Sequence, residues 1–111
     1  MDDFPEFIAR LPELDISLEG VSGHLLQGQN QQVAFVRFQN EIDVPEHSHK
    51  AQWELVVAGE VRLRVHGEEK IYRAGESFYI PEGIVHGALV GAGYKAIIIF
   101  DQADRYGARS S

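Results

Sequence analysis

The feature that most limits the fold of this chain is a series of short, strand-like segments that begins after Asp15 and ends at Phe100. Each segment is rich in Val, Ile, Phe or Tyr, and Gly, Pro or Asn separates most of them from the next. No helical pattern lies between them, so an antiparallel β-sandwich or β-barrel is favoured over an α/β sheet. The ten predicted strands span residues 16–18, 24–27, 33–39, 43–47, 53–58, 61–66, 69–73, 77–80, 85–90 and 94–100.

The segment before these strands adds one element. A short helical or irregular segment is predicted at about residues 4–11, where Pro5 and Pro12 bound a possible helical turn. The full length of 111 residues suits one modest hydrophobic core. We therefore predict a single all-β domain over residues 1–111.

Composition excludes several classes of partner and site. The net charge of −7 and the lack of a Lys/Arg cluster argue against binding to nucleic acid. The absence of cysteine excludes disulfides and thiolate metal ligands. No apolar run reaches about 18 residues and the first residues are acidic, which argues against a membrane span or a signal peptide. We therefore expect a cytoplasmic protein whose partner is a small-molecule ligand, with no nucleic acid and no membrane.

Two histidines, His47 and His49, stand one residue apart where a predicted strand ends. Side chains two residues apart point to the same side of an extended chain, so both imidazoles could bind one metal ion. Such a pair is also common on solvated strands, and alone it leaves both interpretations open. A third histidine, His86, follows a turn signal at Pro81 and Gly83.

The segment around His86 resembles the second motif of the cupin family. That motif has Gly, Pro, Gly and His at fixed spacing, and this sequence matches each spacing. The asparagine that ends the family motif is replaced here by valine. The matching residues are Gly75, Pro81, Gly83 and His86, and the replacement is Val90.

The first cupin motif is matched by His47, His49 and Gly59, although its opening glycine is absent. Counting back from Gly59 puts the acidic position of the motif at Gln52, whereas counting forward from His49 puts it at Glu54. We prefer Gln52, because the hairpin after His49 can lose a residue. The resemblance covers about residues 30–100, which would form the core barrel.

The resemblance implies a double-stranded β-helix, or jelly-roll barrel, with one divalent transition metal: Zn, Ni, Fe, Mn or Cu. Its ligands here would be His47, His49, Gln52 and His86, with Glu54 as the alternative to Gln52. Since side chains alternate along a strand, Glu54 faces the same side as Gln52 and could be a catalytic general base. The other interpretation is that Glu54 reaches solvent at the rim of the barrel.

The cupin scaffold hosts many unrelated chemistries, so the resemblance offers several classes of activity. As an enzyme, such a metal-binding cupin would be a metal-dependent dioxygenase, or an isomerase or lyase, acting on a small oxygenated acid or a sugar-like compound. The alternative is a non-catalytic ligand-binding or sensor cupin with a structural metal. The residues alone do not choose between these classes.

Residues 96–100 are apolar on both faces of their predicted strand, so both faces must be covered. The N-terminal segment or a second subunit could provide the cover, and we expect a homodimer. Arg37 could line the interior or lie on an outer face, and either Ser77 or Tyr79 could hydrogen-bond a ligand. His24 and His66 are predicted at the surface.

Overall fold

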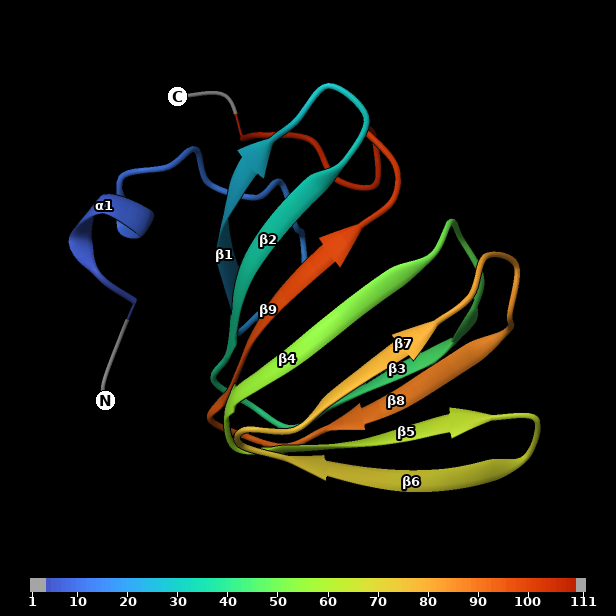
Figure 1. The fold of residues 1–111 in the computed structure, drawn as a ribbon. Helices are drawn as coiled ribbons and strands as arrows, with labels where there is room; N and C mark the ends of the chain where they lie inside the picture. The colour runs from blue at the N-terminus through green and yellow to red at the C-terminus, as the bar shows by residue number, and fades with distance from the viewer. Residues whose placement is uncertain (1–3, 110–111) are drawn as a thin grey trace.

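Antiparallel β-sheet dominates residues 4–109, the part of the chain that the computed structural model describes (Figure 1). The ends of the predicted domain, residues 1–3 and 110–111, lie outside the described residues. One short helix, α1 (Glu6–Ala9), lies within the helical segment predicted at 4–11. The strands are β1 (Val21–Gln27), β2 (Gln32–Phe38), β3 (Ile42–His47), β4 (Gln52–Ala58), β5 (Glu60–Val65), β6 (Glu68–Arg73), β7 (Ser77–Ile80), β8 (His86–Val90) and β9 (Tyr94–Phe100).

The strands form two sheets that face each other (Figure 1). One sheet has five strands in the order β1-β2-β9-β4-β7, and the other has four in the order β3-β8-β5-β6. All neighbouring strands are antiparallel. This arrangement confirms the predicted all-β jelly-roll fold, and nine of the ten predicted strands are present.

The space between the sheets is filled by side chains that alternate along each strand with outward-facing ones. Ala34 in β2 and Ala96 in β9 are fully buried, and they share one apolar cluster with Val61 of β5. Burying a larger apolar side chain in such a cluster stabilises the fold by about 1.5–3 kcal/mol. Between the sheets there is also a cavity, bordered in part by three buried polar residues, Gln52, Glu54 and His86.

The N-terminal segment covers part of the outer face of β1 and β2. The ring of Phe4 packs edge-to-face on Phe35, with ring centroids 5.6 Å apart. His24 Nδ1 forms a hydrogen bond with the carbonyl oxygen of Leu11 at 2.9 Å. The prediction that His24 lies at the surface is therefore wrong, because the N-terminal segment buries it.

The predicted strand at 16–18 is absent. Before it, Glu13 and Leu14 form only isolated bridges, to His24 and Ala108. The Asp15 N–H then donates to a carbonyl of the C-terminal segment rather than to a sheet edge. Ile16 therefore packs beside the barrel without forming a tenth strand, and Leu18 is exposed.

The outer face of the five-stranded sheet carries a row of apolar side chains, here called the apolar row. The pairing registers of neighbouring strands align its members across all five strands. All but the valine are exposed, by 37% to 62%. The row consists of Leu26, Val33, Ile99, Trp53 and Tyr79.

Three side chains that could have lined the interior face outward instead. Tyr79 and Ser77 are exposed on the outer face of β7, so neither can hydrogen-bond a ligand in the cavity. Phe38 borders the cavity, and alternation along β2 turns its neighbour Arg37 to an outer hollow beside Arg109. No helix within residues 4–109 has the length and apolar character needed to cross a membrane.

Candidate metal centre

A β-bulge in β3 brings His47 opposite His86. β3 and β8 pair regularly from Ile42 to Val44, and the register then shifts by one residue so that His47 faces His86. Pro45 lies in this irregular stretch, and proline is tolerated there because β3 is at the edge of its sheet. Bulges redirect side chains, and this one directs His47 to the cavity.

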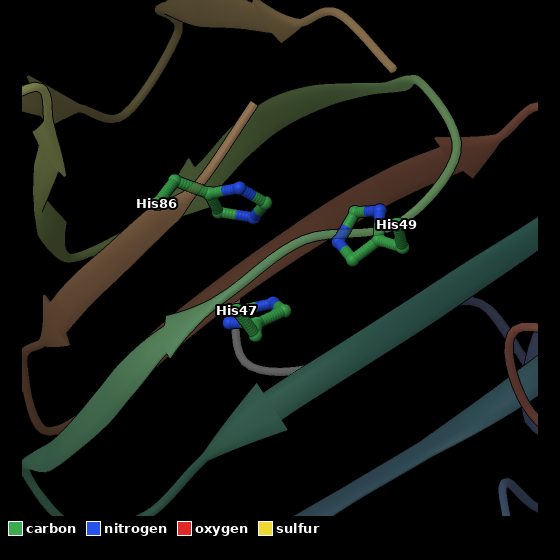
Figure 2. A group of neighbouring side chains, drawn as sticks. All are labelled: His47, His49 and His86. Carbon is green, nitrogen blue, oxygen red and sulfur yellow. The ribbon is translucent and has the colours of Figure 1, made fainter. Parts of the chain in front are cut away.

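The three predicted histidine ligands lie together (Figure 2). His47 ends β3, His49 lies in the following loop, and His86 begins β8. Their ring centroids are 4.4 Å (His47–His86), 4.9 Å (His49–His86) and 5.2 Å (His47–His49) apart. One nitrogen of each ring lies within 4.8 Å of the other two. Because imidazole nitrogens bind such metals at about 2.0–2.1 Å, one ion between the rings could reach all three after small side-chain adjustments.

A backbone carbonyl fixes the proton position on each ring. A carbonyl oxygen can only accept, so each Nδ1 carries the proton and each Nε2 keeps a free lone pair. Metal binding by an imidazole needs that lone pair. The hydrogen bonds are His47 Nδ1 to Pro45 O at 2.9 Å, His49 Nδ1 to Lys50 O at 2.6 Å, and His86 Nδ1 to Ile84 O at 2.9 Å.

The electrostatic environment keeps two of the histidines neutral, the form that binds a metal. Burial lowers the pKa of both His49 and His86 below the ordinary value of 6.5, and the positive charge of Arg105 lowers each pKa further. Both rings are therefore neutral at neutral pH. His49 Nε2 is buried and has no hydrogen-bond partner within residues 4–109. A buried polar atom of this kind needs a partner, and a metal ion would provide one, so the residues fit a divalent metal.

Gln52 and Glu54 border the same cavity as the three histidines, because both face inward from β4. Gln52 Nε2 donates a hydrogen bond to Glu54 Oε1 at 3.0 Å. With its nitrogen bound to Glu54, Gln52 has its carbonyl oxygen left as a possible metal ligand. The histidine group contains no carboxylate from the described residues. The choice of Gln52 as fourth ligand stays a prediction.

Glu54 is buried, so it does not reach solvent at the rim. Its Oε2 accepts a hydrogen bond from the Tyr94 hydroxyl, and its Oε1 accepts the one from Gln52. Burial raises the pKa of Glu54 to about 7, although these two hydrogen bonds oppose the rise. Burial likewise raises the pKa of Tyr94 far above its usual range, so the hydroxyl stays protonated and donates. Near neutral pH the carboxyl can therefore accept or donate a proton.

Sequence patterns did not identify Arg105, which also borders the site. An inner cavity of about 110 Å³ lies between the sheets, and an outer hollow of about 510 Å³ lies beyond it. His47, His49 and Arg105 border both, so they stand where the two meet. Arg105 follows the last strand and belongs to no motif or periodic pattern. Only the return of the C-terminal segment over the barrel brings it to the site.

Comparisons with known proteins agree with this fold. A family model described as Cupin domain matches residues 34–98 of the chain. An RmlC-like cupin from Shewanella frigidimarina has a TM-score of 0.76 and 27% identity, over 93% of this chain and 91% of that one. KdgF from Halomonas sp. has a TM-score of 0.70 and 19% identity, over 82% of this chain and 87% of that one. At the latter identity, the likeness shows the fold alone.

A curated relative matches a shorter stretch. Mannose-1-phosphate guanylyltransferase ManC from Salmonella typhimurium is 42% identical over 45 residues, which are 40% of this chain and 9% of that protein. The matched stretch thus spans about a tenth of the length of the curated relatives. This similarity adds no information about the activity of the chain.

Proposed function

This chain belongs to the cupin domain family, and we propose that it binds one divalent transition metal and catalyses proton transfer within a small oxygenated acid. The ligands would be the Nε2 atoms of His47, His49 and His86 and the amide oxygen of Gln52. A divalent ion held by four neutral ligands keeps its full charge and supplies Lewis-acid chemistry. The proposed reaction class is therefore an isomerisation or an elimination.

The position of Glu54 carries this proposal. It is the only carboxylate of the described residues that borders the inner cavity, and it shares that cavity with the histidines. Its two oxygens each accept one hydrogen bond, from Gln52 and from Tyr94, and each keeps a lone pair for a proton. Because its pKa is about 7, both the acid and the base form exist near neutrality. These features support a role in moving a proton within a bound acid.

Metal binding is tested by elemental analysis of untagged protein. We expect about one divalent ion per chain in the wild type and loss of that ion in His86→Ala. His66→Asn is the matched control, because His66 is exposed in the β5–β6 turn with a φ of 53°, a conformation that asparagine tolerates. Full metal occupancy in His86→Ala would refute the site.

Proton transfer is tested by hydrogen exchange in a probe acid. Metal-loaded protein is incubated in D2O with 2-oxobutyrate, and NMR follows the loss of the hydrogens next to the ketone. We expect exchange in the wild type and a rate about 100-fold or more lower in Glu54→Gln at equal metal content. Equal rates in the two proteins would refute the role of Glu54. Binding of the acid without exchange in the wild type would instead favour a non-catalytic binding cupin.

We also propose a homodimer in which the apolar row of one subunit packs on the same row of another. The row crosses the whole five-stranded sheet, and an apolar face of this kind can pair with itself about a two-fold axis. Trp53 lies between Ile99 and Tyr79 in the row, so Trp53→Glu should prevent association. Light scattering after size exclusion should give twice the chain mass for the wild type at micromolar concentration. A monomeric wild type would refute this proposal.

A further inference from the structure

We propose that Arg105 binds the carboxylate of the ligand, at the boundary between the inner cavity and the outer hollow. This inference rests on the proposed function, because it places the ligand in the same site. Beyond the proposed function, this inference specifies that the ligand carries an anionic group and that Arg105 recognises that group. The ligand class is then a small carboxylic acid with a second oxygen that points to the histidines.

The guanidinium of Arg105 makes no hydrogen bond or ion pair with residues 4–109. Its Nε is buried and makes no hydrogen bond within residues 4–109. No carboxylate of these residues forms an ion pair with it. Asp104, which also borders the outer hollow, instead accepts a hydrogen bond from Gln102 Nε2 at 3.0 Å. A buried guanidinium nitrogen without a partner is costly, and a bound anion would remove that cost.

Contacts to the neighbouring backbone and to the guanidinium itself hold Arg105 in place. Gln32, which is 1% exposed, donates from Nε2 to the Tyr106 carbonyl at 2.7 Å and accepts from the Tyr106 N–H at 3.1 Å. The guanidinium carbon lies 4.5 Å from the Tyr106 ring centroid and 5.7 Å from that of Phe100. A planar guanidinium held over two rings in this way loses little conformational freedom when it binds a carboxylate.

The same contacts connect Arg105 to the histidine group. The Phe100 ring beneath the guanidinium also packs edge-to-face on the His49 ring, with centroids 5.7 Å apart. The histidines and Arg105 therefore border one small space. A small acid can place its carboxylate on Arg105 and a second oxygen among the histidines. Two-point binding of this kind selects against neutral compounds, because they would leave the guanidinium unpaired.

Malonate, a small dicarboxylate without redox chemistry, is a suitable probe, and malonamide is its neutral counterpart. Calorimetry measures the affinity of zinc-loaded protein for each compound. We expect malonate to bind the wild type and malonamide to bind at least about 10-fold more weakly. Arg105→Gln should weaken malonate binding about 10- to 100-fold, the loss expected for hydrogen bonds to a charged group. Arg105→Lys keeps the positive charge but lacks the planar guanidinium that can donate two parallel hydrogen bonds to a carboxylate. This variant should therefore lose part of the affinity for malonate.

Arg62→Gln is the matched control, because Arg62 is exposed on β5 and borders neither the cavity nor the hollow. Zinc content is measured for every protein, so that the two proposals can fail separately. A wild type that takes up no zinc refutes the metal site. Equal malonate affinity of zinc-loaded wild type, Arg105→Gln and Arg105→Lys refutes only the role of Arg105. Inorganic phosphate that binds with the same dependence on Arg105, while malonate shows none, overturns the assignment of a carboxylate.

Discussion

Replacing Glu54 by glutamine should change how the free energy of unfolding depends on pH in the metal-free protein. The carboxyl has a pKa of about 7 in the folded protein, against an ordinary value of 4.5. Below the lower value it is protonated in both states and adds no pH dependence. Between the two values the unfolded chain releases the proton while the folded protein keeps it. The stability of the wild type therefore falls as pH rises through this window.

The size of the effect follows from the two pKa values. They differ by about 2.5, and each difference of one in pKa corresponds to about 1.4 kcal/mol. Ionisation of buried Glu54 thus costs about 3 kcal/mol of stability above a pH of about 7. Glutamine cannot ionise, so Glu54→Gln should resemble the wild type at a pH of about 4.5. At a pH of about 8 it should be more stable than the wild type by up to about 3 kcal/mol.

Urea unfolding in the presence of a chelator, at a series of pH values between about 4 and 8.5, measures this difference. Glu69→Gln is the control, because it removes a carboxylate that is exposed on β6 rather than buried. If the stability difference between Glu54→Gln and the wild type is the same at both ends of the range, burial does not raise the pKa of Glu54. Glu54 would then be ionised at neutral pH and could not donate a proton there.

Three further predictions concern the surroundings of the site. Gly87→Ala should reduce the free energy of unfolding by about 1–3 kcal/mol in urea titrations, because a Cβ there would lie 2.9 Å from a β3 carbonyl oxygen and would also meet the Glu46 carboxylate. Tyr94→Phe removes the hydroxyl donor that lowers the pKa of Glu54, so the fall in stability should extend to higher pH and become larger; an unchanged profile would mean that this hydrogen bond does not favour the carboxylate. Zinc at about 100 times its dissociation constant should add about 2.7 kcal/mol of stability, seen as a higher melting temperature, and His86→Ala should abolish the gain.

The three histidines of the site could be predicted, because their positions depend on the spacing of residues that are close in the sequence. Alternation predicted that His47 and His49 point to one side, and both border the cavity although His49 lies in the loop after β3. The position of His86 follows from a glycine and proline pattern that sets the turn before β8. Sequence spacing could not predict the β-bulge at Pro45. That bulge shifts the pairing of β3 and β8 by one residue, and it depends on contacts between segments far apart in the chain.

The features that sequence analysis missed depend on segments that fold back over the barrel. His24 is buried because the N-terminal segment covers β1, and Arg105 reaches the site because Gln32 binds the backbone of Tyr106. Neither segment has regular periodicity at these residues, so residue propensity and side-chain alternation could not predict where the two segments lie. The absent strand at 16–18 has the same origin, because the residues just before it, 13–15, bond to the backbone of the C-terminal segment and not all to a sheet edge.

The site divides its chemistry among three parts of the fold. The four-stranded sheet and its loop supply the histidines, β4 and β9 supply Glu54 and Tyr94, and the C-terminal segment supplies Arg105. The first two parts are locked by strand pairing and core packing, whereas Arg105 lies outside the strands. Substitutions at Arg105 should therefore change which ligand binds, while the strands that hold His47, His86 and Glu54 keep their positions. A scaffold built in this way can change its substrate through one segment and keep its reaction, as expected when binding residues lie on loops over a rigid framework.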